Sequence, residues 1–123
     1  MDNISFDQFE AVEIRIGTVI AADVPEWSHW VMRIKADFGS EIGEKQCFSG
    51  IMKFFSPAEL VGKQFPFIMN LEPRKIGPEK ELSEVMMIMA CPGDASTDPK
   101  VQEETPTVLF QLQEKVENGT KVR

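Results

Sequence analysis

The fold is decided by the stretch Phe54-Phe55-Ser56-Pro57-Ala58-Glu59-Leu60-Val61-Gly62, which predicts a single turn of helix in mid-chain. Ser56 is placed to act as the N-cap, and Pro57 follows at the first helical position, where its missing N–H is tolerated. Gly62 stands just past the end, where helices typically stop. We therefore expect a short helix that separates the strands before it from the strands after it.

Three strands are expected before this helix. Residues 13–22 alternate with a period of two and predict one long strand, with Gly17 as a bend or bulge. Its buried face should carry Ile14, Ile16, Thr18, Ile20 and Ala22. Residues 31–38 and 45–48 predict a hairpin. The inward side chains of its first strand should be Met32, Ile34, Ala36 and Phe38. A short helix, capped by Ser5 and Gln8, should precede all three strands.

Two more strands complete the expected core. Residues 64–71 alternate, and Pro66 favours an edge strand or a bulge over a central position. Their apolar face should hold Phe65, Phe67, Met69 and Leu71. Residues 85–90 are apolar throughout, which predicts a strand covered on both faces. Residues 92–106 have the composition of an exposed loop, and 107–112 predict one further strand before a polar tail.

This order predicts an all-β fold. Five strands with a helix between the third and fourth describe the OB-fold, a small Greek-key barrel, here with a short N-terminal helix and a C-terminal extension strand. The 123 residues, 42% of them apolar, suit a single domain over 1–123. We expect its core to span about 6–92 and its extension about 93–123.

The net charge of −7 argues against indiscriminate binding to phosphate polymers, because that binding depends on cations. Residues 51–80 are the exception, with five basic and three acidic residues. This excess of +2 is either ordinary fluctuation or the sign of a ligand-facing segment.

The longest apolar run, residues 85–91, is far shorter than the ~20 residues of a membrane-spanning helix. The start, Met1-Asp2-Asn3, shows no signal pattern, so we expect a cytoplasmic protein without membrane insertion. Cys47 and Cys91 belong to no Cys-x-x-Cys pair. We expect both to be reduced and buried.

Residues typical of catalysis are scarce. His29 is the only histidine, and no pattern ties it to Cys47 or Cys91 as a nucleophile pair. The sequence has no glycine-rich phosphate loop and no set of residues with the spacing of metal ligands. We expect a binding protein that is not an enzyme, takes no cofactor and holds no metal.

Five motifs resemble those of a known family: Val12-Glu13-Ile14-Arg15-Ile16-Gly17, Lys45-Gln46-Cys47-Phe48-Ser49-Gly50-Ile51, Phe55-Ser56-Pro57-Ala58-Glu59-Leu60-Val61-Gly62-Lys63, Asn70-Leu71-Glu72-Pro73-Arg74-Lys75-Ile76 and Ser83-Glu84-Val85-Met86. Through them the chain resembles the tRNA-binding domain that is found alone or attached to aminoacyl-tRNA synthetases, as at the C-terminus of methionyl-tRNA synthetase. The resemblance spans about residues 6–92. It implies an OB-fold with tRNA as its partner.

Three features are similar to one branch of that family, the CsaA proteins, which are described as export-related chaperones. They are the Ser-Glu-Val variant of the last motif, the stretch 37–46 and the ending Asn118-Gly119-Thr120-Lys121. The branch implies unfolded preproteins or export machinery as alternative partners, and a homodimer. The surface at which the two copies of the dimer meet would come from the N-terminal helix, the strand around residues 108–112 and neighbouring strand edges.

The motifs also imply an RNA-binding site. Arg74 and Lys75 lie on a loop stiffened by Pro73 and suit phosphates, while Asn70 could bind a base edge or cap the loop backbone. Ser83 and Met86 match family positions that face nucleic acid, as a hydrogen-bond donor and a packing surface. Two further candidates are Lys53, which could be a simple surface lysine, and Arg15, which could instead pair with Glu13 or Asp37.

The competing hypothesis is a peptide site. The loop 27–30 departs from the family pattern, since Trp27 and Trp30 stand where a basic residue is usual. Indole rings could stack bases, anchor an unfolded peptide or merely cover the barrel mouth. With Phe48 and Met86 they make up the alternative peptide-binding set. Val85, in place of a frequent glycine, also favours the chaperone branch.

Overall fold

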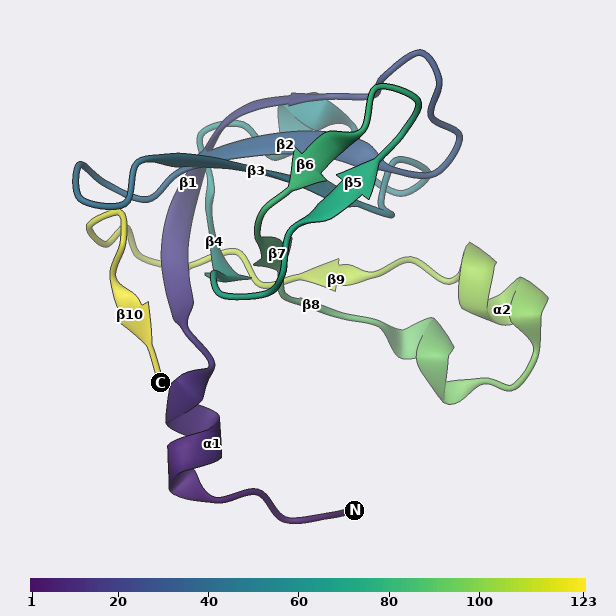
Figure 1. Cartoon of the computed structure of the whole chain (residues 1–123). Helices are drawn as coiled ribbons and strands as arrows, with labels where there is room; N and C mark the ends of the chain where they lie inside the picture. The colour runs from purple at the N-terminus through teal and green to yellow at the C-terminus, as the bar shows by residue number, and fades with distance from the viewer.

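The computed structural model describes residues 1–123, and its central element is the long strand β1 (Ile14–Asp23). The first half of β1 pairs with β4 (Gln64–Ile68), and the second half pairs with β2 (Met32–Asp37), both antiparallel. β3 (Glu44–Ser49) pairs with the other edge of β2, and β7 (Met86–Met87) pairs with the other edge of β4. The resulting order is β3-β2-β1-β4-β7 (Figure 1).

The two ends of this sheet meet. The backbone N–H of Glu84, just before β7, donates to the carbonyl of Gln46 in β3 at 2.8 Å. The sheet therefore curls into a nearly closed barrel, and the predicted all-β OB-fold is confirmed. The expected helical turn, η1 (Pro57–Glu59), lies between β3 and β4, with Gly62 at φ 86° just beyond its end.

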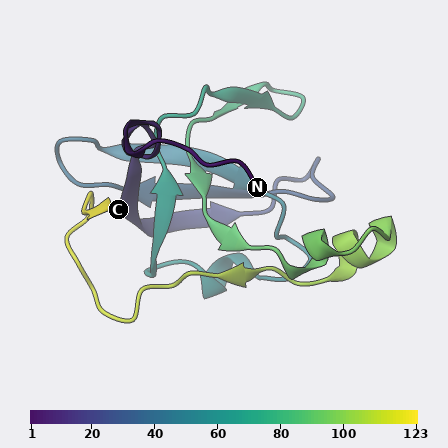
Figure 2. The ribbon, with the colours of Figure 1, turned by 90° about the horizontal axis from the view of Figure 1, so that it is seen from below.

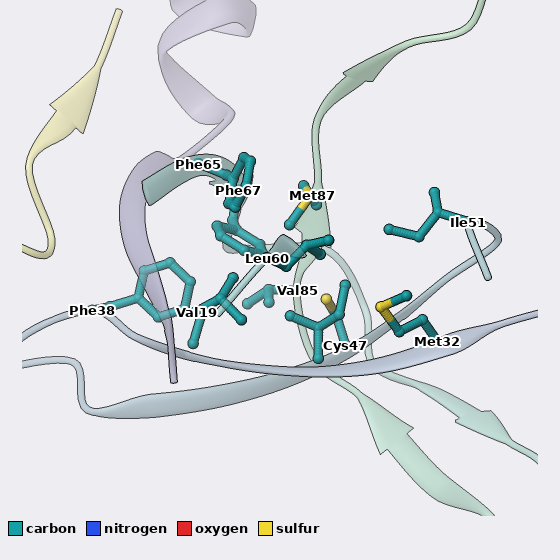
Figure 3. Packing of buried hydrophobic residues seen from close by; sticks show 12 residues of the cluster. Val19, Met32, Phe38, Cys47, Ile51, Leu60, Phe65, Phe67, Val85 and Met87 are labelled. Atoms are coloured by element: carbon teal, nitrogen blue, oxygen red, sulfur yellow. The ribbon is translucent and has the colours of Figure 1, made fainter. Parts of the chain in front are cut away.

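The interior of the barrel holds twelve buried apolar residues (Figure 3). Phe38 and Phe67 meet edge to face, with ring centroids 5.1 Å apart. The alternation predicted for β2 is confirmed, because its inward side chains are all at most 1% exposed. The cluster consists of Val19, Met32, Ile34, Ala36, Phe38, Cys47, Ile51, Leu60, Phe65, Phe67, Val85 and Met87.

The face predicted for β1 was wrong. Gly17 and Val19 face the core, whereas Ile20 is exposed. A register shift between Val19 and Ala21 then brings Ala22 to the core side. The bulge is therefore not at Gly17. A Cβ there would lie 2.6 Å from the Phe38 ring, so Gly17 is required by the core. Ile16 points to the outer face, where the C-terminal segment covers it: its N–H donates to the carbonyl of Thr120 at 2.9 Å.

Strand β4 is not an edge strand, contrary to the expectation from Pro66. It lies between β1 and β7. Pro66 pairs with Ile16, whose N–H and carbonyl already bond to Thr120 and Gly119, so the register with β1 requires no N–H from the proline. Its carbonyl accepts from Ile88, the residue at which the next strand breaks.

The region expected as one strand over 85–90 is two short ones, β7 and β8 (Met89–Ala90). Its covering is also incomplete, since Met86 is 46% exposed. β8 pairs with β9 (Val108–Leu109), which is the extension strand in shortened form. Between them the expected loop contains two short helices, η2 (Pro92–Ala95) and α2 (Pro99–Glu104), and they project from the barrel in both views (Figure 2).

The N-terminal helix and the C-terminal strand lie beside each other at the start of β1. Helix α1 (Phe6–Ala11) has the predicted cap, because the backbone N–H of Gln8 donates to the Ser5 hydroxyl and the N–H of Ser5 to the Gln8 side chain. The expected polar tail instead forms β10 (Lys121–Val122), which pairs with β1 (Figure 1). No helix of the structure is both long and apolar enough to cross a bilayer.

Candidate functional site

A hairpin that the sequence analysis missed carries most of the candidate residues. β5 (Arg74–Ile76) and β6 (Glu81–Ser83) pair antiparallel and stand on the barrel beside β3 (Figure 1). Arg74 and Lys75 are thus in a strand, not a loop. Because successive side chains of a strand point to opposite faces, the two cations are separated. Arg74 shares its face with Ser83, and Lys75 shares the other with Leu82.

The Arg74 face borders a pocket of about 290 Å³. Its floor and walls come from β3, the hairpin and the segment leading into β7. The pocket brings together Arg74, Ser83 and Met86 of the predicted RNA set with Phe48 of the alternative peptide set. The complete lining is Phe48, Leu71, Glu72, Arg74, Ser83, Glu84, Val85 and Met86.

The base of the pocket is held rigid by hydrogen bonds to β3. The hydroxyl oxygen of Ser83, which is 8% exposed, accepts from the backbone N–H of Phe48 at 3.2 Å. The carboxylate of Glu84 accepts from the backbone N–H of Gln46 at 3.2 Å and lies 3.8 Å from the Lys45 ammonium. Ser83 keeps its hydroxyl hydrogen to donate, as a serine can do both.

The rim of the pocket carries two charged side chains that have no partner within the chain. Arg74 and Glu72 are both exposed, and neither forms an ion pair or a side-chain hydrogen bond with the rest of the chain. Met86 offers its half-exposed thioether as an apolar surface between them and the core. The site therefore combines an apolar wall with one unpaired cation and one unpaired anion.

Arg33 in β2 fastens the hairpin to the barrel. Its guanidinium forms a bidentate pair with Asp23, at 2.9 and 2.6 Å, and also reaches Glu81 in β6 at 2.8 Å. Hydrogen bonds to Asp23, with a smaller contribution from Glu81, raise the pKa of Arg33 above its usual value, against the opposing effect of burial. Arg33 is thus a positioning residue, and no motif singled it out.

The two tryptophans have different surroundings. Trp27 is half buried against Phe48, with ring centroids 6.1 Å apart, and Gly77 in the hairpin turn lies so close that a Cβ would be 2.5 Å from the indole. Trp27 thus supports the hairpin. Trp30 is 44% exposed, and the ammonium of Lys53 lies 5.4 Å from its ring centroid. Neither tryptophan lines the pocket.

Two predicted RNA contacts have structural roles elsewhere. The amide of Asn70 caps backbone, accepting from the N–H of Glu13 at 2.9 Å and donating to the carbonyl of Ala11 at 2.6 Å. Arg15 pairs with Glu13 and donates to the carbonyl of Gly119 at 3.1 Å. Both residues join α1, β1 and the C-terminal segment, away from the lining of the pocket.

A family of known proteins is similar in sequence to this chain. The family model of the tRNA binding domain matches residues 14–121. The chain belongs to the tRNA-binding-domain family. Its members include methionine–tRNA ligases: that of Halalkalibacterium halodurans is 38% identical over 93 residues, which are 76% of this chain and 14% of the ligase. Ligase 1 of Bacillus anthracis is 30% identical over 99% of this chain and 16% of the ligase. The domain thus spans about one seventh of these relatives.

Two solved structures match this chain over nearly its whole length. The chaperone CsaA of Bacillus anthracis has a TM-score of 0.79 at 30% identity, covering 99% of this chain and 100% of that one. A protein of Pyrococcus horikoshii described as related to methionyl-tRNA synthetase has a TM-score of 0.83 at 27% identity, covering both chains fully.

Proposed function

We propose that this protein is a non-catalytic tRNA-binding protein of the cytoplasm. Its membership of the tRNA-binding-domain family supports this function. The main structural support is the rim of the pocket. There Arg74 has no partner in the chain, is the cross-strand neighbour of Ser83 and lies in the same pocket as the exposed side chain of Met86. An unpaired guanidinium beside an apolar wall suits a phosphate and its base together.

The mode of binding follows from the hairpin. Arg74 and Lys75 present cations on its two faces, so two phosphates on a folded RNA contact it at once. Since the molecule is acidic as a whole, these contacts are local and the affinity is modest and salt-sensitive. Arg15 and Asn70, which are occupied within the chain, are left out of this interface.

Charge reversal tests the site. We expect Arg74→Glu with Lys75→Glu to weaken binding of labelled bulk tRNA about tenfold or more at low salt. The matched control is Lys100→Glu with Lys115→Glu, which changes the net charge equally at exposed positions outside the pocket. Equal losses in both variants would show that net charge, rather than the hairpin, governs binding.

A second candidate is binding of unfolded polypeptide, as the name of the CsaA chaperone structures suggests for those proteins. The specific observation in its favour is that large apolar side chains are exposed, Leu71 and Met86 at the pocket and Trp30 outside its lining. Apolar contacts are insensitive to salt, so we expect this activity to tolerate salt and to weaken in Trp30→Ala. Suppressed aggregation of an unfolded client, lost in that variant, would establish it.

We also propose a homodimer. Phe6 and Phe9 of α1 are exposed with their rings 6.4 Å apart, beside a pocket of about 340 Å³ formed with β10. Val108 and Phe110 of the C-terminal segment are also exposed, and Phe110 lines a second pocket that shares Lys121, Val122 and Arg123 with the first. Apolar patches of this kind on a soluble protein mark an interface, and a second copy is the simplest partner.

A further inference from the structure

The pocket beside the hairpin contains a feature that binding to phosphate does not explain. Glu72 lines it together with Arg74, and its carboxylate has no partner in the chain. A free carboxylate repels phosphate, so it would weaken a site built only for the RNA backbone. Glu84, the other acid of the lining, is already held by Gln46 and Lys45. Glu72 therefore suits a ligand group that donates hydrogen bonds better than a phosphate.

The dimensions of the pocket favour a single base. Its volume of about 290 Å³ lies just below the roughly 300–1,000 Å³ of small-molecule sites. Phe48, Leu71, Val85 and Met86 supply apolar walls for the flat faces of a ring. Unpaired bases of RNA are recognised in this way, by packing on the ring and by hydrogen bonds to the base edge.

The charges select one base. An ionised carboxylate accepts hydrogen bonds only, and its two oxygens suit a pair of neighbouring donors. Guanine alone among the four bases presents two adjacent donors, N1–H and the N2 amino group, on its Watson–Crick edge. Adenine and cytosine place an acceptor next to their amino group, and uracil offers a single N–H between two carbonyls.

We propose that the pocket lined by Glu72, Arg74 and Met86 is a subsite for one unpaired guanine of the bound RNA. Glu72 accepts from N1–H and the N2 amino group, the base packs on Met86, and Arg74 binds the adjoining phosphate. This inference rests on the proposed function and adds base selectivity to it.

The test uses short labelled oligouridines that carry a single guanosine, adenosine, cytidine or inosine, titrated with the whole chain and followed by fluorescence anisotropy. A bidentate contact of this kind predicts about tenfold tighter binding of the guanosine probe than of the adenosine probe. Inosine, which lacks the N2 amino group, should fall between them. Glu72→Gln should reduce the preference strongly, because its amide oxygen can accept from only one of the two donors while its NH2 group opposes the other.

The matched control is Glu79→Gln, in the same hairpin but outside the pocket lining. Both variants remove one negative charge, so the ratio between probes, not the affinity itself, is the measured quantity. A preference that persists undiminished in Glu72→Gln, or equal binding of all probes with tRNA binding intact, overturns the guanine subsite alone. Failure to bind tRNA or any probe at low salt overturns the proposed function as well.

Discussion

At the scale of single residues, the two thiols have opposite surroundings. Cys47 is buried in the core as expected, but Cys91 is exposed, because it follows β8 where the chain leaves the barrel. We expect one thiol per chain to react rapidly with a thiol reagent at mildly alkaline pH and the second only after unfolding. Cys91→Ser should remove the rapid phase. Two rapid thiols in the folded wild type would contradict the burial of Cys47.

Burial also raises the pKa of the Cys47 thiol from 9.0 to about 12. Below pH 9 the thiol is protonated in both states, so its contribution to stability is constant. Between pH 9 and 12 only the unfolded state loses this proton, and the contribution falls by up to about 1.4 kcal/mol per pH unit. Urea unfolding across this range should therefore show a steeper loss for the wild type than for Cys47→Ala. Parallel curves would contradict the shifted pKa.

The motifs predicted which residues belong to the site, but they did not predict which way each side chain points. Arg74, Ser83 and Met86 were singled out from sequence and do share one pocket. That Lys75 faces away from it depends on the register of β5 with β6. Asn70 could not be assigned, since its partners Glu13 and Ala11 are nearly sixty residues away in the chain and only the fold brings them together.

At the scale of elements, the hairpin is positioned by the contacts of Arg33 with Asp23 and Glu81. These ion pairs are partly exposed, so we expect Arg33→Met to lower the free energy of unfolding by only about 1 kcal/mol. Local order should change more. Amide hydrogen exchange should accelerate across residues 74–83 while the β2 amides stay protected.

Lys35→Met is the control for that experiment. Lys35 is the neighbouring cation on β2, and its 4.0 Å contact with Glu44 stays within the β2–β3 pair. The Lys35→Met variant should leave amide exchange in the hairpin unchanged. Unaltered hairpin exchange in Arg33→Met would show that Arg33 does not position β5 and β6, and that Trp27 and the hydrogen bonds to β3 suffice.

Elements were predictable where alternation is regular and not where it is interrupted. β2 has a clean period of two and was predicted with its inward face. In β1 one bulged residue reverses the pattern. The strands β5 and β6 have three residues each, too few to show a period, and α2 is a six-residue helix inside a segment with the composition of a loop.

At the scale of the whole molecule, the proposed dimer makes a simple prediction. Phe9→Asp and Phe110→Asp place charges in the exposed apolar surface of α1 and the C-terminal segment. Each should shift the sedimentation coefficient from that of a dimer to that of a monomer, because a charge buried at an interface is unpaired. Val61→Asp, at an equally exposed apolar residue beyond η1, should leave the dimer intact. A wild type that sediments as a monomer would contradict the proposal.

The central claim, that this protein binds tRNA through its hairpin, is tested most directly by the anisotropy of labelled bulk tRNA titrated with the wild type at low and fourfold higher salt. Two phosphate contacts predict about a tenfold loss of affinity over that range. The account predicts this loss, and a flat salt dependence in Arg74→Glu with Lys75→Glu. No binding at the lower salt would contradict it and leave polypeptide binding as the function to pursue.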